Sequence, residues 1–347
     1  MPTLFFCFIA FLLAAYVVLD GYDLGAGLLH HFVAKSDAER RTVLATIGPL
    51  WDGNEVFLVA TGGTLFFAFP ELYAITFSGF YLPLMMVLWL LILRGISLDF
   101  RSHLEATVWR QLFDATFALA SGFLAFLLGV AIGNVVRGVP IGADRVFLQP
   151  LWTDLMAQGD TGIVDWYTVI VGFTSVAALA LQGALWLVYR TSGAVRDRAR
   201  ALVPRLWLTA AALSVVMSVV TFGVQPHLRD TFAGEPWRLV FPVLAVAALA
   251  ATFVFHRRGR AGLAFAGFSG FLALLLASAA FGLYPWVLPS SLDPRFSLTV
   301  DQVHAAESSL AIGAVWWPIG ITLAVGYTVY VHWRFSVGAP GKAHTEA

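Results

Sequence analysis

Long apolar runs constrain the fold of this chain more than any other feature. Nine of them are about 20 residues long, enough to cross the roughly 30 Å hydrocarbon core of a bilayer. They lack the alternation of β-barrel strands and therefore predict α-helices. With 59% hydrophobic and only 12% charged residues, the sequence predicts an all-α polytopic membrane protein with nine spans. The predicted spans are residues 3–22, 50–69, 74–93, 113–136, 163–188, 206–224, 239–255, 263–283 and 310–331.

Basic residues predict how these spans are oriented. Sixteen of the 21 lysines and arginines fall on alternate connections, and the positive-inside rule makes that side cytoplasmic. The N-terminus is then outside and the C-terminus inside, with residues 1–337 as a single membrane domain and 338–347 as a short disordered cytoplasmic tail. These basic residues are Lys35, Arg40, Arg41, Arg94, Arg101, Arg110, Arg190, Arg196, Arg198, Arg200, Arg205, Arg257, Arg258, Arg260, Arg334 and Lys342.

Other composition features exclude several functions. The net charge is zero, so nothing indicates binding to nucleic acid. The single cysteine, Cys7, excludes a disulfide framework, a cysteine-based zinc site and an iron–sulfur cluster held by this chain. The first apolar run has no basic leader, and we expect it to be a retained signal anchor.

The second predicted span contains two carboxylates, Asp52 and Glu55. Only residues 56–69 form a clean apolar run, and 14 residues are too few to cross the membrane. Either this segment is not a span or the carboxylates lie at membrane depth. Ionisable groups at that depth are costly and usually functional.

More acidic residues are predicted on the same, cytoplasmic, side. Asp20 and Asp23 end the first span and are three residues apart, as Asp52 and Glu55 are, so each pair would share a helix face. Carboxylates that lie close together oppose one another's ionisation, whereas a nearby arginine favours it. The third span ends at this side with Arg94, Asp99 and Arg101. Such a group could transfer protons or form structural ion pairs.

Each of these residues also has a purely structural interpretation. Asp52 and Glu55 fit a role at a helix N-terminus, where negative charge is favourable. Asp20 and Asp23 fit less well, because they are predicted at a helix C-terminus in a glycine-rich stretch that would break the helix. Arg94, Asp99 and Arg101 are also compatible with anchoring at the cytoplasmic surface. Gly62, Gly63 and Gly79 are expected to mark close helix packing.

None of the eight histidines is predicted near the centre of a span. A haem held within the bundle usually needs an axial His, Met or Cys at depth. His30 and His31 could ligate a group near the inner surface, but adjacent helical residues point in different directions. The sequence contains no phosphate-binding loop, nucleophile triad or His-x-x-x-His metal motif. These features predict a membrane subunit rather than a self-contained enzyme.

Several motifs resemble subunit II of cytochrome bd-type quinol oxidases. They are Asp-Gly-Tyr-Asp-Leu-Gly at 20–25, Gly-Pro-Leu-Trp-Asp-Gly-Asn-Glu-Val at 48–56, Phe-Pro-x-x-Tyr-Ala-x-x-Phe-Ser-Gly-Phe-Tyr at 69–81 and Arg-Gly-x-x-x-Asp-Phe-Arg at 94–101. Shorter matches follow at 133–134, 138–140, 182–184, 284–285 and 288–291. They run in order along nearly the whole chain.

The resemblance implies a haem-free subunit built from two four-helix bundles and one extra helix. Its obligate partner in that family, subunit I, holds two b-type haems and haem d. The complex lies in the bacterial inner membrane, oxidises quinol on the outer side and reduces dioxygen to water with four electrons. It takes the protons from the cytoplasm and builds a gradient without pumping. Small single-span accessory subunits and a structural quinone also occur in the family.

The resemblance further implies roles for particular residues. Asp52 becomes a proton relay, with Asp20, Asp23 and Glu55 as supporting carboxylates. Trp51 and Asn54 belong to the same motif, and Arg94, Asp99 and Arg101 form a polar network near haem propionates or the subunit interface. Glu55 stands where some members have glutamine. The alternative is a secondary transporter with a cation site at Asp20, Asp23 and Asp52, but such sites usually lie at the midplane of the membrane.

Overall fold

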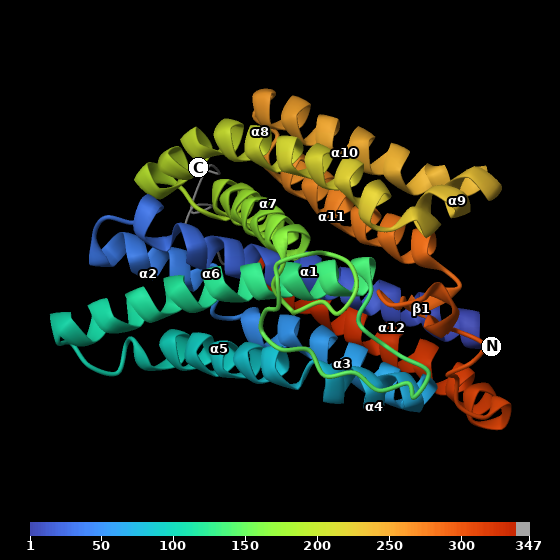
Figure 1. Ribbon diagram of the computed structural model, residues 1–347. Coiled ribbons are helices and arrows are strands. Elements are labelled where there is room, and N and C mark those ends of the chain that lie inside the picture. Colours follow the sequence, from blue (N-terminus) through green and yellow to red (C-terminus); the bar gives the residue numbers. More distant parts are fainter. Residues whose placement is uncertain (338–347) are drawn as a thin grey trace.

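The computed structural model describes residues 1–337, and the predicted tail at 338–347 lies outside the described part. Long helices dominate this part of the chain (Figure 1). The α-helices are α1 (Pro2–Val33), α2 (Asp37–Ala45), α3 (Trp51–Ala68), α4 (Pro70–Gly79), α5 (Tyr81–Phe100), α6 (Thr107–Arg137), α7 (Trp166–Arg190), α8 (Gly193–Val224), α9 (Pro226–Gly234), α10 (Val240–Arg257), α11 (Ala261–Leu283) and α12 (Glu307–Val337). Short 3₁₀-helices span Pro236–Leu239 and Pro294–Phe296, and strands β1 (Trp286–Leu288) and β2 (Leu298–Thr299) form one antiparallel pair.

Eight helices of the described part are long and apolar enough to cross a membrane. They are α1, α5, α6, α7, α8, α10 with its preceding 3₁₀ turn, α11 and α12. The predicted all-α polytopic membrane protein is therefore confirmed. The remaining predicted span, the second at 50–69, forms the 18-residue helix α3, whose first turns carry Asp52, Asn54 and Glu55 and lower its hydropathy.

Helix α1 corrects one prediction. It continues without a break to Val33, so Asp20 and Asp23 lie inside the helix rather than at its C-terminus. The glycines of this stretch serve close packing instead of breaking the helix. A Cβ on Gly25 would overlap the backbone of α7 at Leu179 and Gly183.

The third predicted span, 74–93, has different bounds in the structure. The chain leaves the helical conformation at Phe80, which separates α4 from α5. Pro83 lies in the first turn of α5 and has no N–H to bond the carbonyl of Gly79, so the two helices cannot join there through that bond. Helix α5 then continues to Phe100 and carries Arg94 in its second half.

The glycines predicted to mark close packing differ from one another. A Cβ added to Gly62 or Gly63 would meet no atom within 4 Å, so for these two the prediction is wrong within residues 1–337. Gly79 does lie in tight contact, against the ring of Phe147. The closest helix contact that depends on glycine is instead the crossing of α1 and α7.

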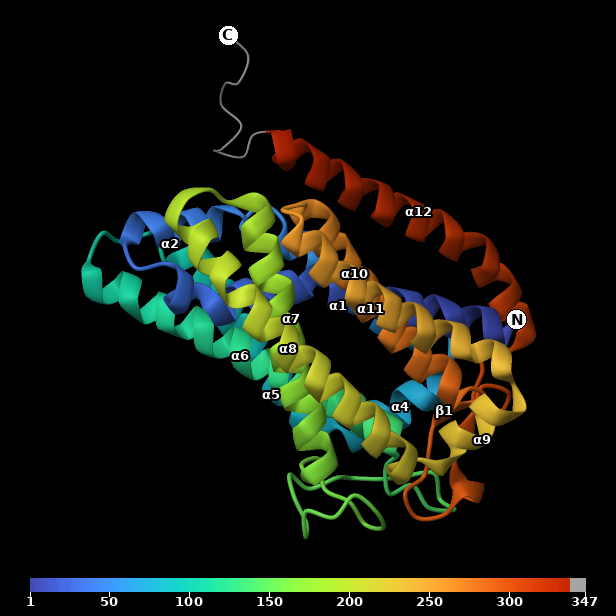
Figure 2. The same cartoon turned by 90° about the horizontal axis from the view of Figure 1, so that it is seen from above.

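Helix α1 lies at the centre of the packing. It contacts α3 and α6 on one side and α7 and α11 on the other, and α5 packs on α6 (Figures 1 and 2). Helices α7 and α8 pack on each other, as do α10 and α11. Helix α12 lies at the edge, where Figure 2 shows it running alongside the rest, and only 11% of its apolar window is buried.

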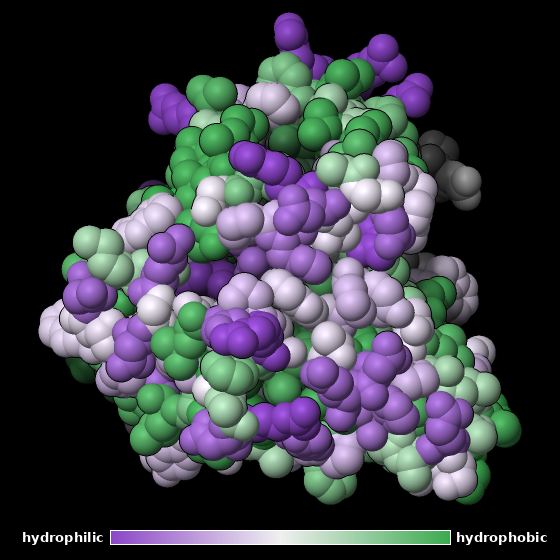
Figure 3. Space-filling model, turned by 45° about the vertical axis from the view of Figure 1, so that its right-hand side comes forward, coloured by the Kyte–Doolittle hydropathy of each residue, from purple (hydrophilic) through white to green (hydrophobic). Residues whose placement is uncertain are grey.

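Residues 138–165 and 284–306 form an ordered cap at one end of the helices. Their apolar side chains join a hydrophobic cluster with the ends of α1, α3 and α4, which includes Val139, Phe147 and Leu298. Arg137, at the end of α6, forms a buried ion pair with Asp165, the N-cap of α7. Figure 3 shows hydrophilic side chains gathered across this end, with hydrophobic ones on the helix flanks.

Candidate functional site

Helices α1, α3 and α5 bring most of the predicted site residues together. Arg94 Nη1 donates to Asp20 Oδ1 at 2.6 Å, and Arg94 Nη2 donates to Glu55 Oε1 at 2.5 Å. Asn54 Nδ2 donates to Asp23 Oδ2 at 2.8 Å. We call these five residues, Asp20, Asp23, Asn54, Glu55 and Arg94, the acid-rich cluster.

The charges of the acid-rich cluster do not balance. Three carboxylates face a single guanidinium, and the side chains of Arg94 and Asp20 are fully buried. Asp20 Oδ2 and Asp23 Oδ1 are buried without a hydrogen-bond partner. Buried charges that are not neutralised are costly, so the cluster has the capacity to bind a proton or another cation.

A hydrogen-bonded extension leads from this cluster to α12. Asn54 Nδ2 donates to the Tyr22 hydroxyl at 2.8 Å, and that hydroxyl lies 2.9 Å from Nε2 of His332. His332 Nδ1 lies 2.8 Å from the Thr328 carbonyl oxygen, to which it must donate. His332 Nε2 therefore accepts from Tyr22 when the ring is neutral. Neither residue was predicted, because the sequence does not reveal how α12 lies against α1.

Asp52 occupies a different environment from the other carboxylates of its motif. It lies in the first turn of α3 and is exposed, with no side-chain hydrogen bond or ion pair within residues 1–337. Glu55 is one turn further along on the same face. Trp51 packs toward α5, where a Cβ on Gly95 would come within 3.2 Å of its ring.

Arg101 belongs to a second cluster, not to that of Arg94. Arg101 Nε donates to Asp114 Oδ1 at 2.5 Å, His30 Nε2 lies 2.8 Å from the same oxygen, and Arg40 Nη1 donates to Oδ2 at 3.0 Å. Asp37 extends the network through Arg101, Arg41 and Arg110. We call this group, Asp37, Asp114, His30, Arg40, Arg41, Arg101 and Arg110, the base-rich cluster.

Asp99 joins neither cluster. Its side chain is exposed near the end of α5 and makes no hydrogen bond or ion pair within residues 1–337, although its backbone carbonyl lies 3.0 Å from Nδ1 of His103. The predicted polar network of Arg94, Asp99 and Arg101 is therefore wrong as one unit. Arg94 lies in α5 and Arg101, seven residues later, caps the C-terminus of that helix, and each pairs with a different set of acids.

Asp114 and Asp37 were not predicted as site residues. Asp114 lies in the third turn of α6, just inside the predicted span 113–136, where a lone carboxylate among apolar residues is a signal of pairing. The hydrogen bonds from Arg101 and Arg41 lower the pKa of Asp37. Glu39, on the same short helix α2, is held by Arg198 in a bidentate pair that lowers its pKa to about 2.

His30 and His31 are the histidines that could ligate a group near the inner surface. No group of three His, Cys, Asp or Glu residues in that part of the chain is placed to hold a metal. His30 is fully buried, its Nε2 is bonded to Asp114, and its ring packs against Phe117 and His31. These contacts do not fit an axial haem ligand.

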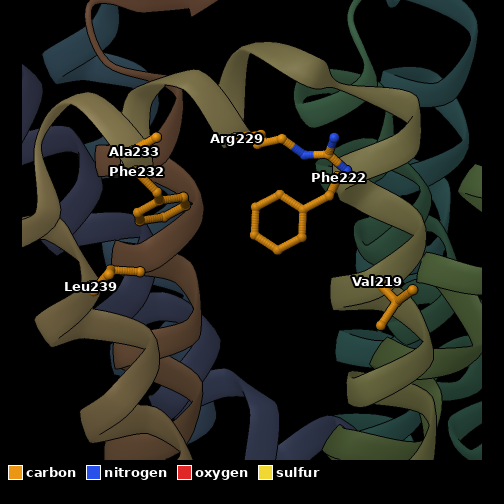
Figure 4. Close-up of a pocket in the computed structure, with 6 residues that line it drawn as sticks. All are labelled: Val219, Phe222, Arg229, Phe232, Ala233 and Leu239. Carbon is orange, nitrogen blue, oxygen red and sulfur yellow. The ribbon is translucent and has the colours of Figure 1, made fainter.

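Two cavities lie away from the acid-rich cluster. One, of about 470 Å³, lies between α8, α9 and the start of α10 and is lined by Phe222, Phe232 and Arg229 (Figure 4). The other, of about 440 Å³, lies between the end of α7, the start of α11 and α12. It includes His332 and so adjoins the extension of the cluster.

Together these features define a helical membrane subunit with two separate clusters of charged residues among α1, α2, α3, α5 and α6. The chain belongs to the cytochrome bd terminal oxidase subunit II family, whose model matches residues 1–335. It is a subunit of a quinol oxidase of the bacterial respiratory chain. The subunit lies in the inner membrane of the bacterium. This confirms the resemblance, and the alternative of a secondary transporter is not favoured.

Individual relatives agree with this assignment. The chain is 31% identical to the "Cytochrome bd-I ubiquinol oxidase subunit 2" of Escherichia coli K12, over 93% of this chain and 91% of that protein. It is 28% identical to the "Cytochrome bd ubiquinol oxidase subunit 2" of Bacillus subtilis, over 96% of both. The bd oxidase structure from Geobacillus thermodenitrificans contains a chain with the same fold, with a TM-score of 0.76, 21% identity and coverage of 96% of this chain and 97% of that one.

Proposed function

We propose that this chain is the haem-free partner of a subunit I that carries two b-type haems and haem d. The complex oxidises quinol and reduces dioxygen to water with four electrons, and the haem chemistry lies in subunit I. The names of the relatives support ubiquinol oxidation.

The proposed topology has nine crossings, with α3 and α4 together forming the second. Helix α3 supports this because it packs lengthwise on α1, a membrane-spanning helix. Helices α1, α3, α5 and α6 then form one four-helix bundle, α7, α8, α10 and α11 form the other, and α12 is the extra helix. The N-terminus lies outside and the C-terminus in the cytoplasm, and residues 1–337 form one membrane domain.

We infer that Asp52 accepts protons from the cytoplasm for the reduction of dioxygen. The observation that carries this proposal is its exposed carboxylate, which no residue of the described chain neutralises, at the surface of an oxidase subunit. A carboxylate bound in a strong ion pair would exchange protons poorly. Asp52 is the acid of the motif that has no such partner.

The acid-rich cluster supports Asp52 from one helical turn away. Glu55 lies on the same face of α3 and pairs with Arg94, which in turn pairs with Asp20. Arg94 holds these carboxylates in place, and their excess negative charge keeps the local potential favourable for a proton. Asp20, Asp23 and Glu55 therefore act as positioning residues, and only Asp52 faces outward.

Asp52→Asn tests this proposal in the intact complex. We expect oxygen consumption per assembled complex to fall by about tenfold or more, within the range typical for loss of one acid–base group. Assembly and the haem absorbance spectrum should stay unchanged, because the Asp52 side chain makes no hydrogen bond or ion pair within residues 1–337. The matched control is Asp99→Asn, which removes another exposed carboxylate from the neighbouring helix α5.

Two outcomes would contradict the role of Asp52. Full turnover in Asp52→Asn would show that protons enter elsewhere. Failure of that variant to assemble, with normal assembly of Asp99→Asn, would show that Asp52 holds the helix end or the subunit interface together.

A further inference from the structure

The cavity between α7, α11 and α12 contains two donors without a partner. The Nε1 of Trp186 and the Nε of Arg190 are both buried and make no hydrogen bond. Both residues line the cavity, and they lie one turn apart on the same face of α7. Trp186 is only 2% exposed, so water at the surface of the subunit does not compensate its indole N–H.

The start of helix α11 adds further donors to this cavity. Gly262 is the second residue of α11 and lines the cavity, and no side chain caps this helix end. First-turn amides lack intrahelical acceptors, and the helix dipole makes this end positive. The connection before α11 carries Arg257, Arg258 and Arg260, which add positive charge nearby.

The groups around the cavity therefore select one kind of ligand. Its polar lining consists of the Arg190 guanidinium, the Tyr189 hydroxyl, the His332 ring and two indoles, and none of its lining residues is acidic. His332 already uses both ring nitrogens, on Tyr22 and Thr328. The groups that remain for a ligand, the Trp186 indole N–H and the Arg190 guanidinium, are donors, so the ligand must supply acceptor oxygens and negative charge.

The shape and position of the cavity favour a lipid as the source of that anion. About 440 Å³ is within the range of roughly 300–1,000 Å³ for small-molecule pockets, and aromatic rings such as Phe265 form much of its wall. One side is formed by α12, and only 11% of the apolar window of α12 is buried. By the basic residues, this end of the helices is the cytoplasmic one, where anionic lipids are attracted to basic pockets between spans.

We propose that this cavity binds the phosphate group of an anionic phospholipid from the cytoplasmic leaflet. The phosphate oxygens accept from Arg190 Nε, Trp186 Nε1 and the Gly262 amide of α11, while the glycerol and upper acyl carbons contact the aromatic wall. Arg190 Nη2 already donates to the Phe335 carbonyl at 2.9 Å. The lipid would therefore connect α12 to α7 and α11. Helix α12 by itself packs only weakly against these two helices.

Lipid binding to the purified, delipidated complex of both subunits tests the proposal. Native mass spectrometry with added phosphatidylglycerol would give the affinity of each bound copy. Arg190→Gln should weaken one copy by about tenfold, since a hydrogen bond to a charged group is lost. Trp186→Phe keeps an aromatic ring but removes the N–H, and should weaken the same copy a few-fold. Arg295→Gln, an exposed arginine at the other end of the molecule, should change nothing.

Competition on the wild-type complex identifies the source of the phosphate. Phosphatidylglycerol should bind more tightly than phosphatidylcholine, and equal concentrations of inorganic phosphate should not displace it. Equal binding of both lipids, displacement by inorganic phosphate or displacement by a short-chain quinone would each overturn the proposal. So would unchanged affinity in both cavity variants. None of these results depends on the role of Asp52.

Discussion

The two charged clusters both combine carboxylates with arginines, but carboxylates are in excess in one and arginines in the other. In the acid-rich cluster, three carboxylates share one arginine, and two carboxylate oxygens have no hydrogen-bond partner. In the base-rich cluster, Asp114 receives three partners, and both of its oxygens are used. Four arginines there face two carboxylates.

This difference separates a cluster suited to proton exchange from one suited to holding helix ends together. Residual negative charge inside the membrane can be relieved by taking up a proton. A carboxylate that already accepts hydrogen bonds from three cationic or donor groups is not stabilised further by taking up a proton. The base-rich cluster also joins α1, α2, α5 and α6 at one end, where such ties fix helix ends in place. We therefore expect neutralised carboxylates of the first cluster to affect turnover through Asp52 and those of the second to affect stability. Loss of the single arginine of the first cluster should affect assembly.

Removal of Arg94 should have the largest effect. Arg94→Gln leaves Asp20 and Glu55 without their only cation, and breaking a buried pair in this way costs about 3–5 kcal/mol. We expect little assembled complex, measured as haem absorbance per amount of membrane protein and as a lower midpoint of thermal unfolding.

The double variant Asp20→Asn/Arg94→Gln separates charge imbalance from lost shape. It removes one acid together with the base, so assembly should recover in part, because replacing both partners of a buried pair costs far less than removing one. If the double variant assembled no better than Arg94→Gln, the acid-rich cluster would not be limited by its charge.

Asp114→Asn should have the next largest effect, and this effect should be on the thermal stability of the complex alone. It removes the negative charge that Arg40, Arg101 and His30 share, which we expect to cost about 2–4 kcal/mol because Arg40 and Asp37 remain partly solvated. Oxygen consumption per assembled complex should equal that of the wild type. A selective loss of turnover with normal thermal stability would remove the distinction between the clusters.

Much of the fold could be predicted because apolar runs and basic connections obey strong constraints in a membrane. Eight of the predicted spans correspond to helices that meet the length and hydropathy needed for a crossing. Helix ends were harder to predict. Glycine after Asp20 normally weakens a helix in water, yet α1 stays intact because α7 packs directly on Gly25. The break at Phe80 depends on Pro83, and Phe147 from a distant loop packs against Gly79 beside it.

The acid-rich cluster was more predictable than the base-rich one for a physical reason. Asp20, Asp23, Glu55 and Arg94 are conspicuous because each interrupts an apolar run. His30, Asp37 and Arg40 look like ordinary surface residues, since they lie near helix ends. Only the three-dimensional packing of α2 and α6 reveals their contacts. The same limit hid the contact between Tyr22 and His332, which joins residues 310 positions apart.

Tyr22→Phe should have a smaller effect. It tests whether the hydrogen-bonded extension from the acid-rich cluster to α12 takes part in proton transfer. The change removes the hydroxyl between Asn54 and His332, which should cost about 1 kcal/mol, while the stacked ring remains on Trp186. Turnover should stay normal, because the proposed protons enter at Asp52 and not from α12. A large loss of oxygen consumption, with normal haem content, would instead make His332 and Tyr22 part of the proton route.

The smallest effect is expected at the exposed edge of the base-rich region, where Glu39 pairs with Arg198. The hydrogen bonds from Arg198 lower the pKa of Glu39 to about 2. Because this folded-state pKa is below that of the unfolded chain, about 4.3, the stabilisation is present at neutral pH and is lost as the pH falls from about 4.3 through 2.

Glu39→Gln should therefore lower the thermal midpoint slightly at pH 7, and this difference from the wild type should shrink toward pH 3. Asp293→Asn is the matched control, because Asp293 also has a lowered pKa and an arginine partner, Arg295, but joins no helices. If Asp293→Asn shifted the midpoint as much as Glu39→Gln, the effect would come from surface charge in general. If only Glu39→Gln did so, the cause would be the ion pair that connects α2 to α8. Stabilising ion pairs would then extend beyond the buried part of the base-rich cluster.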